Sequence, residues 1–473
     1  MNDNKPIGIY IILYIPWLLS LFFDSSPIAS YLIAWLGSFF IFYITLTGKL
    51  KPLPNDRGIA EQLMRPIFLV QIIFAGYMCS TSIFYFLDVL GYQNFKKVNN
   101  YFLIDQNRLM ITAQCQRYYC LAHAAFVSGI LIFMKYPVKQ KYYIEKEKLA
   151  NLLFKLALAM LPISTIFLKV PGLAQYYFKF SSLSFIAGTL ALAFAIPLKK
   201  PMNTLISLIL FIFNFYQALI SGFKEPIIIS IVVLGLFLYP NYKKVVTITF
   251  VPLLMSLFLI LPTYNRVFRQ NSWSGETGSD EASQLAINAV MDISHTNDNS
   301  DWAFYTSRLS EIGMFATFVQ STPTHIDYYG TKLLEQSAMA IIPRIFWPSK
   351  LSTEQLIMER VYNAGVVQRG SNVSAKPAFI ADAYLSGGTF GVFFFLFIYG
   401  AVTQLISLKA EELFGGYILG TALMFSGLFQ ILWRGTSFEF LINSVFWSYI
   451  SMLVLFKIFK ATKILNEIED PAY

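Results

Sequence analysis

Charged residues are scarce in this chain: only 13% of its 473 residues are Asp, Glu, Lys or Arg. Ordinary soluble domains carry about 25% charged residues, so the composition excludes that class. The chain instead has 56% hydrophobic residues and a mean hydropathy of +0.55. It contains no soluble module in which basic and aromatic residues alternate, so nucleic acid is not expected as a partner.

Cysteine and histidine are also rare, with three residues of each type. Cys79, Cys115 and Cys120 all fall in hydrophobic runs, and there is no CxxC motif or Cys/His cluster, which argues against a disulfide framework and a zinc site. The chain also lacks a P-loop, a GxSxG or HExxH motif, and a dinucleotide fingerprint in a suitable context. We therefore expect no metal, no cofactor and no energy coupling by nucleotide.

Hydrophobic runs fill most of the chain. Most have about the 17 to 25 residues that a helix needs to cross a membrane. We count twelve, near residues 7–23, 28–47, 66–88, 111–134, 149–168, 182–198, 203–221, 226–239, 245–262, 386–408, 413–432 and 438–456. The first run lacks the small-residue cleavage site of a signal peptide, so we expect it to remain as a span. The predicted fold is an all-α polytopic integral membrane protein with the lipid bilayer as a partner.

The basic residues of the short loops predict the orientation. If the N-terminus is cytoplasmic, the loops on that side carry eighteen lysines and arginines, against seven in the short loops opposite. Because cytoplasmic loops are enriched in Lys and Arg, both termini are predicted to be cytoplasmic. The net charge of +9 then mostly reflects topology.

The chain divides into three parts. Residues 1–262 hold the first nine spans, residues 263–385 form one large external loop, and residues 386–473 hold the last three spans and a cytoplasmic tail. No internal repeat of 20 to 50 residues is present, which argues against a solenoid. Chemistry outside the membrane is therefore expected in residues 263–385.

The large loop has the pattern of several short helices. A helix is predicted to begin near Ser279, after a flexible Gly/Ser-rich stretch. Two amphipathic helices follow, from about Tyr305 to Gln320 and from about Thr331 to Ile342, each ended by a proline. A further helix starts with Ser352 or Thr353 as its N-cap and ends at Gly365. We expect such short one-sided helices to lie on the outer membrane surface.

Charged residues at membrane depth are functional candidates, because burying them there is costly. The run at 226–239 would span only about 21 Å as a helix, so Lys224 and Glu225 beside it would sink toward the bundle. They form either an ion pair at a hairpin tip or a site where Lys224 faces an anionic head group. Arg117 and His123 are either functional groups or, respectively, a snorkelling cation and a packing residue.

The stretch "AIIPRIFWPSK", residues 340–350, places Arg344 and Lys350 around Trp347 at a predicted helix end. Arg266 lies where the chain leaves the ninth run. The planar guanidinium of arginine suits diphosphate oxygens and stays charged in any surroundings. The alternative is that these cations anchor the chain at the membrane interface beside an aromatic belt.

A general base facing outward could be one of several residues. Glu311 is the first choice and His325 the second, with Asp301, Asp327 and Asp382 as further candidates. Glu311 follows Arg308 by three residues on one face of the predicted helix, so the two either form an ion pair or leave Glu311 free to deprotonate a sugar hydroxyl.

Two segments carry a resemblance to a known family: "RLSEIGMFATFVQSTPTHIDYYGTKLLEQSAMAIIPRIFWPSK" and "AYLSGGTFGVFFFLFIYG". This order of Arg-led helix, Pro-and-Gly loop, Pro-Arg/Trp-Pro/Lys box and Gly-rich span resembles the Wzy-type polymerases of bacterial surface polysaccharides, over about residues 305–400. "SGFKEP" has Phe223 and Lys224 where many of these proteins have a small residue and an arginine.

The resemblance implies a GT-C-like, metal-independent and inverting glycosyltransferase. Such enzymes work on the external, periplasmic face of the bacterial plasma (inner) membrane. They move a growing glycan from undecaprenyl diphosphate onto a new undecaprenyl-diphosphate-linked oligosaccharide unit. A chain-length regulator and a flippase are implied as partners. Applied to this chain, the resemblance implies diphosphate binding by Arg344, Arg308, Arg266, Lys224 and Lys350, sugar stacking by Trp347 and Tyr329, and base catalysis by Glu311 or His325.

Two other functions are considered. An O-antigen ligase performs the same chemistry on a different acceptor, but neither His295 nor His325 lies in a convincing version of the histidine motif of ligases. A transporter or flippase of lipid-linked sugars commonly has repeated halves and little mass outside the membrane, and neither feature fits this chain.

Overall fold

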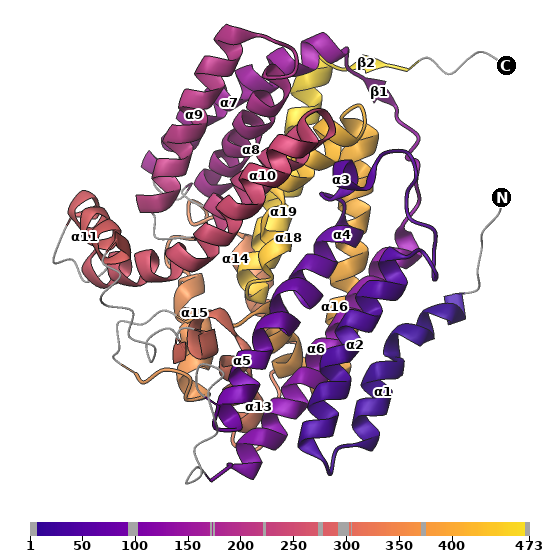
Figure 1. Ribbon diagram of the computed structural model, residues 1–473, viewed down its shortest axis with the longest axis vertical. Coiled ribbons are helices and arrows are strands. Elements are labelled where there is room, and N and C mark those ends of the chain that lie inside the picture. Colours follow the sequence, from indigo (N-terminus) through magenta and orange to yellow (C-terminus); the bar gives the residue numbers. More distant parts are fainter. Residues whose placement is uncertain are drawn as a thin grey trace.

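The computed structural model describes residues 7–92, 103–170, 173, 176–220, 224–272, 278–291, 302–303, 305–369 and 375–468. These residues form a helical bundle (Figure 1). The elements before the middle of the chain are η1 (Ile7–Tyr14), α1 (Ile15–Phe22), α2 (Pro27–Leu46), α3 (Ile59–Gln62), α4 (Pro66–Gln71), η2 (Ile72–Cys79), α5 (Ser80–Val89), α6 (Gln106–Phe133), β1 (Tyr142–Tyr143), α7 (Lys146–Lys169), α8 (Tyr177–Ala195) and α9 (Pro201–Ile220). They are followed by α10 (Lys224–Ser272), α11 (Ser279–Met291), η5 (Tyr305–Leu309), α13 (Ile312–Ser321), α14 (Lys332–Ile341), α15 (Thr353–Asn363), α16 (Phe379–Leu413), η6 (Ile418–Phe425), α17 (Ser426–Leu428), α18 (Ile431–Arg434), α19 (Phe438–Ala461) and β2 (Asn466–Glu467).

Eight helices in the described part of the chain are long and apolar enough to cross a membrane, which makes this a multi-pass membrane protein. They are Pro27–Leu46, Pro66–Val89, Lys148–Phe167, Tyr177–Ala195, Pro201–Ile220, Ile227–Leu257, Phe379–Leu413 and Phe438–Ala461. The run predicted at 111–134 belongs to α6, which is also long: its 28 residues rise about 42 Å. Its many polar side chains, rather than its length, separate it from the eight.

Two of the twelve predicted runs are shorter helices than expected. The run at 7–23 yields the apolar helix Gly8–Phe22. The run at 413–432 is interrupted, because α16 ends before Gly415 and Gly416, whose φ angles are positive, and the next apolar helix covers only Ile418–Leu428.

α10 is a helical hairpin and not one straight rod. Its backbone leaves helical geometry at Tyr242 (φ −133°, ψ 44°). The ring of Phe250 lies so close to Gly235 that an added Cβ there would come within 2.9 Å of it, and Ile227 and Leu261 share one apolar cluster. The runs predicted at 226–239 and 245–262 are therefore its two arms, and the helix continues past residue 262 to Ser272.

α16 also doubles back. Gly388 has φ +59°, a conformation that favours glycine over residues with a side chain. The rings of Phe379 and Tyr399 lie 4.5 Å apart between centroids, although a straight helix would separate these residues by about 30 Å. Residues 379–386 therefore form a short re-entrant helix that lies along the longer helix of residues 389–413. The predicted boundary at residue 385 falls inside this re-entrant helix.

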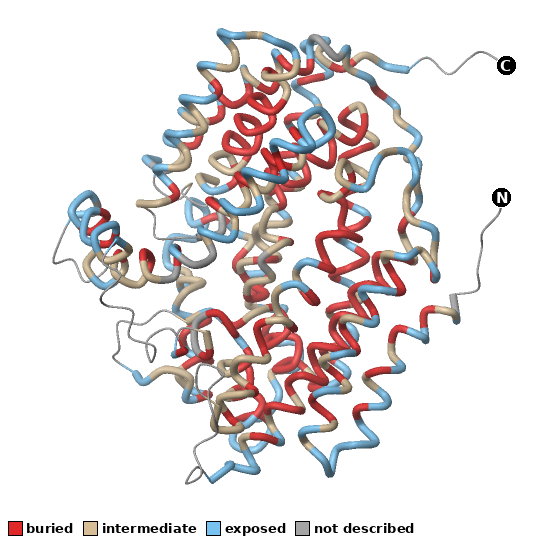
Figure 2. The backbone as a smooth tube through the Cα atoms, in the orientation of Figure 1, coloured by how far each residue is buried: buried red, intermediate tan, exposed pale blue. Residues whose placement is uncertain are grey.

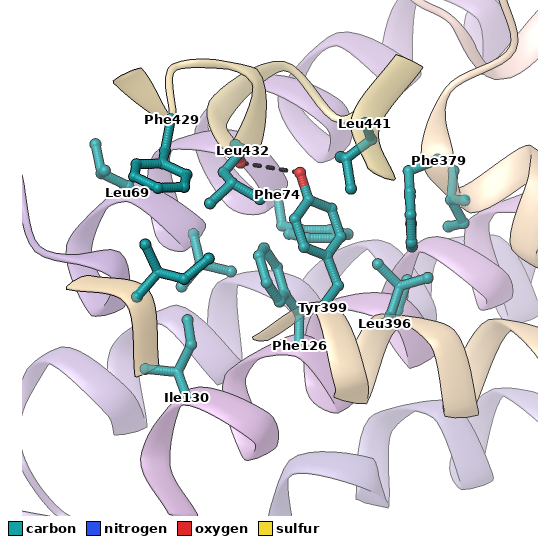
Figure 3. Packing of buried hydrophobic residues seen from close by; sticks show 14 of the residues in the cluster. Leu69, Phe74, Phe126, Ile130, Phe379, Leu396, Tyr399, Phe429, Leu432 and Leu441 are labelled. Atoms are coloured by element: carbon teal, nitrogen blue, oxygen red, sulfur yellow. Dashed lines mark hydrogen bonds between the residues drawn. The ribbon is translucent and has the colours of Figure 1, made fainter. Parts of the chain in front are cut away.

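α6 and α16 form the centre of the molecule. An added Cβ at Gly129 or at Gly400 would lie 2.2 or 2.1 Å from a main-chain oxygen of the opposite helix, so the two backbones touch. Figure 2 shows the buried residues concentrated on these central helices. The rings of Phe126 and Tyr399 pack against each other beside this crossing with their planes tilted by 33°, and the Tyr399 hydroxyl donates to the Leu432 carbonyl oxygen at 3.1 Å (Figure 3).

The loops gather at two ends of the bundle, as the alternation of predicted sides requires. At one end, Lys51 donates to the Leu131 carbonyl, and the β1–β2 pair joins the segment after α6 to the C-terminal segment. At the other end, the Trp302 indole donates to Asp88 and the Tyr384 hydroxyl to the Thr322 carbonyl. We call the first the β-ladder end. The second, where Arg344 and Arg360 lie, we call the arginine end.

The short helices of the large loop agree with the predicted pattern in part. α11, α14 and α15 begin close to the predicted positions, and the Ser352 hydroxyl and the Gln355 side chain form a complete capping box. The helix predicted at Tyr305–Gln320 is instead broken into η5 and α13. The apolar face of α13 packs on protein, because Ile312, Phe315 and Phe318 are buried against the bundle.

Candidate functional site

The Arg344 segment begins at a fixed point. α14 buries Leu333, Ser337 and Ala340, and the indole N–H of Trp447 on α19 donates to the Ile341 carbonyl at 2.8 Å. Pro343 then prevents the helix from continuing. The chain that follows is thus held against α19 at the arginine end.

Lys350 folds back onto the end of α14. Its ammonium group donates to the carbonyls of Met339 at 3.4 Å, Ala340 at 3.1 Å and Ile342. Cations are favourable at this position because the last carbonyls of a helix lack partners and carry partial negative charge. Burial, together with the nearby charge of Arg344, lowers the pKa of Lys350. The Lys350 ammonium is therefore already occupied as a helix cap.

Arg344 is exposed and has no hydrogen bond or ion pair with any residue that the structure describes. The apolar side chains after it are exposed too: Ile345 to 55%, Phe346 to 78% and Trp347 to 38%. We call residues 344–347 the arginine rim. Exposed aromatic and aliphatic side chains beside a cation are typical of the level at which lipid head groups meet the hydrocarbon.

Tyr329 lies away from the rim. Its amide donates to the Leu385 carbonyl at 2.8 Å, which joins the loop before α14 to the re-entrant helix. Its ring is half-buried, and burial raises the pKa of Tyr329 although the charge of Arg360 opposes this. Lys332 lies 6.0 Å over the ring. Tyr329 is thus part of the packing between the loop before α14 and the re-entrant helix, and Trp347 is the more accessible aromatic side chain.

The two predicted bases lie at opposite ends of α13. Glu311 precedes the helix and His325 follows it, so ten helical residues, or about 15 Å, lie between them. Both side chains are exposed. Glu311 and Arg308 do not share one continuous helix, because the chain leaves η5 after Leu309.

The other predicted cations are not gathered around the rim. Arg266 is partly buried on α10 between Tyr264 and Phe268, which pack against α11. Within the described residues no hydrogen bond or ion pair joins Arg266 to the rim. The side chains of Arg308 and Lys224, and the whole of Asp301, lie outside the described residues.

A buried triad of charges is the strongest electrostatic feature of the arginine end. Arg360 is 2% exposed and makes two hydrogen bonds to the Asp382 carboxylate, at 3.0 and 2.8 Å, and two to the Glu439 carboxylate, at 2.6 and 2.8 Å. Asp382 also accepts from the Phe438 amide at 2.9 Å. Asp382 lies on the re-entrant helix and Glu439 on α19, so the triad ties both to α15.

The two carboxylates of the triad are not available to act as general bases. Asp382 and Glu439 are both fully buried and already accept hydrogen bonds, so Asp382 is not positioned as an outward-facing base. The sequence analysis did not predict the triad. The available signal was a carboxylate inside each apolar stretch, "AFIADAYLSGG" and "TSFEFLI".

A second polar site at the arginine end is a cavity of about 160 Å³ between α5, α6 and α13. Its lining includes Tyr85, Arg108, Thr317 and Gln320. Arg108 is held there by the Tyr85 hydroxyl at 3.2 Å and by Asp88 at 3.3 Å. Because its guanidinium is balanced by a carboxylate, this cavity is less suited than the rim to take an anion.

Lys179, on α8, is a buried cation with neutral partners. Its ammonium donates to the Ser444 carbonyl at 2.6 Å and to the hydroxyls of Ser444 and Ser448 at 3.0 and 3.2 Å. These contacts join α8 to the part of α19 that holds Ile341 through Trp447. Lys179 therefore supports the surface from which the arginine rim extends.

Comparison with known proteins gives a family but no function. A family model described as a domain of unknown function (DUF8712) matches residues 15–467, so one family description covers nearly the whole chain. No curated protein and no solved structure matches the chain.

Proposed function

We propose that this chain, which belongs to the DUF8712 family, is a glycosyltransferase that polymerises lipid-linked oligosaccharide units. In this proposal it moves the growing glycan from undecaprenyl diphosphate to the end of a new lipid-linked unit. The arginine end then faces the exterior of the bacterial plasma membrane, where the two lipid-linked substrates meet. A flippase would supply the units and a chain-length regulator would limit the product.

The arginine rim is the observation that carries the proposal. A polyprenyl diphosphate presents a doubly charged head group at the top of a hydrocarbon chain. Arg344, without a partner among the described residues, offers a fork of donors for the phosphate oxygens. Ile345, Phe346 and Trp347 offer apolar and aromatic contacts at the same level. The resemblance of residues 305–400 to Wzy-type polymerases supports the same assignment.

The reaction needs two groups beside the sugar. A base takes the proton of the acceptor hydroxyl while the oxygen of that hydroxyl attacks the anomeric carbon. The bond from the anomeric carbon to the diphosphate oxygen breaks in the same step. Arg344 would stabilise the negative charge that develops on the leaving diphosphate. Glu311 remains our first choice for the base and His325 the second, since both are exposed at the arginine end.

The test is a polymerisation assay with purified protein in detergent and undecaprenyl-diphosphate-linked repeat units as the only substrate. Wild type should produce a ladder of glycans, and Arg344→Ala should lower the rate at least about 100-fold, as loss of a leaving-group contact does. Arg369→Ala is the matched control, because Arg369 is an exposed arginine of the same segment that is already paired with Glu359 at 2.6 Å.

The outcomes separate the competing functions. A wild-type ladder from Arg344→Ala would overturn the role of the rim. Transfer only to a lipid core or a protein acceptor would indicate a ligase. The absence of any glycan product from wild-type protein, with movement of lipid-linked units across vesicles, would indicate a transporter.

A further inference from the structure

A basic groove lies at the β-ladder end, away from the arginine rim. It has a volume of about 490 Å³ and is lined by Lys135, Lys139, Lys141 and Lys409, with Leu405 and Leu408 on the wall formed by α16. Among the described residues, Glu412 is the one carboxylate in this lining. The groove therefore combines lysines at its edge with an apolar wall.

The groove forms because the chain after α6 crosses over the C-terminal end of α16. We call residues 135–141 of this crossing segment the strap. The Lys141 amide donates to the Glu412 carbonyl at 3.3 Å, and Tyr142 and Tyr143 pair with Glu467 and Asn466 as a two-stranded ladder. These contacts hold residues 135–141 beside the last turns of α16 and leave the space between them open.

The groove carries excess positive charge. Four lysines are among the described residues that line it, and Glu412 pairs with two of them, with Lys141 at 2.6 Å and with Lys409 at 2.9 Å. The hydrogen bond that the Lys141 ammonium donates to Glu412 raises the pKa of Lys141. Next to the groove, burial and the charge of Lys135 lower the pKa of Lys51, as expected where positive charges accumulate.

The wall belongs to the membrane-crossing part of the molecule. Leu405 is 47% exposed on α16, one turn before Lys409, and Leu408 is half-buried beside it. A ligand in the groove would thus meet lysines at its polar end and leucines at its apolar end. Basic pockets between transmembrane helices on the cytoplasmic side are the usual setting for anionic lipid head groups.

We infer that this groove binds an anionic phospholipid, with the phosphate among Lys135, Lys139 and Lys409 and the upper part of an acyl chain along Leu405 and Leu408. The site is independent of the glycan chemistry proposed for the opposite end. The lipid would fix the strap against α16 and hold the β-ladder end at the level of the anionic cytoplasmic leaflet.

The experiment is native mass spectrometry of the full chain in detergent with dioleoyl phosphatidylglycerol or dioleoyl phosphatidylcholine. Wild type should retain phosphatidylglycerol at least about tenfold better than phosphatidylcholine, and Lys135→Gln, Lys139→Gln and Lys409→Gln together should remove that preference. Lys141 is left intact because it holds the strap. The matched control is Lys199→Gln, Lys200→Gln and Lys244→Gln, which removes the same charge outside the groove and should change retention less than about twofold.

Several results would overturn the inference. These are equal retention of the two lipids by wild type, equal effects of the two triple variants, and displacement of phosphatidylglycerol by excess inorganic phosphate, which would indicate a site for a soluble anion. If the groove triple variant does not fold, single Lys135→Gln and Lys139→Gln variants should each weaken phosphatidylglycerol binding about fivefold. Unchanged binding in both would count against the site.

Discussion

Arg360 and Arg344 belong to the same segment between α11 and α16, but their surroundings are opposite. Arg360 is 2% exposed and gives four hydrogen bonds to two carboxylates. Arg344 is exposed beside an apolar rim and has no partner among the described residues. The guanidinium of Arg360 is engaged in hydrogen bonds that hold the fold together, whereas the guanidinium of Arg344 is available to a ligand.

The difference shows why charge in a hydrophobic protein has two meanings. A buried guanidinium must be fully paired, because an uncompensated charge away from water is very costly. A guanidinium at the membrane level can stay unpaired because lipid head groups and water solvate it. Structural and binding arginines should therefore separate when stability and activity are measured on the same variants.

Arg360→Met is expected to have the largest effect on stability. It leaves Asp382 and Glu439 buried without their cation, and breaking a buried pair in this way costs about 3 to 5 kcal/mol. The melting temperature in detergent should fall sharply, or the protein should fail to accumulate in the membrane. Arg369→Met is the control, since its pair with Glu359 is exposed and screened by solvent and therefore contributes little to stability. Similar melting temperatures for the two variants would contradict the structural role of Arg360.

Gly388→Ala is expected to have the next largest effect on stability. The residue has φ +59°, and an added Cβ would lie 2.8 Å from the Tyr328 hydroxyl oxygen, so the turn before the long helix of α16 would be strained. With ψ −137° as well, this backbone conformation is one that glycine adopts far more readily than other residues, and holding a residue with a side chain in it costs about 1 to 3 kcal/mol. The measurement is again thermal unfolding. Gly278→Ala, at a glycine with open space around it, serves as the control, and an equal shift in both would argue against a strained turn.

Arg344→Lys sharpens the contrast from the other side. Lysine keeps the charge but loses the planar fork, so the polymerisation rate should fall about tenfold while the melting temperature stays within about 1 °C of wild type. Wild-type activity in this variant would mean that only the charge matters. A large loss of stability would mean that Arg344, like Arg360, serves the fold.

The fold was predictable wherever it depended on local pattern. Runs of apolar residues predicted α2, α9 and α19 closely, and Ser352 signalled the start of α15. The re-entrant helix was not predictable in this way. "AFIADAYLSGGTFGV" has the composition of the start of one span, and it is the structure, through the positive φ at Gly388 and the contact of the Phe379 and Tyr399 rings, that shows that the chain turns back.

The candidate site was predictable only as a set of residue types. Arg360 meets Asp382 across 22 residues and Glu439 across 79, distances at which helix periodicity carries no information. α13 shows the same limit on a smaller scale. Its apolar stripe could face lipid or protein, and the sequence does not distinguish a helix on the membrane surface from one packed on α6.

Lys350 is intermediate between the two arginines, because it is partly exposed and is held by main-chain carbonyls rather than by carboxylates. Its variant tests whether such a cation serves the fold or the ligand. It caps α14 through three carbonyls, and a cation at a helix C-terminus contributes about 0.3 to 1 kcal/mol. Lys350→Met should therefore lower the melting temperature slightly and leave the polymerisation rate within about twofold of wild type. Lys332→Met, at the N-terminus of the same helix, should leave stability unchanged or raise it slightly, because a cation there opposes the helix dipole. A loss of activity in Lys350→Met without a loss of stability would place Lys350 with Arg344 in the diphosphate site, and its hydrogen bonds to α14 would then describe only the resting state.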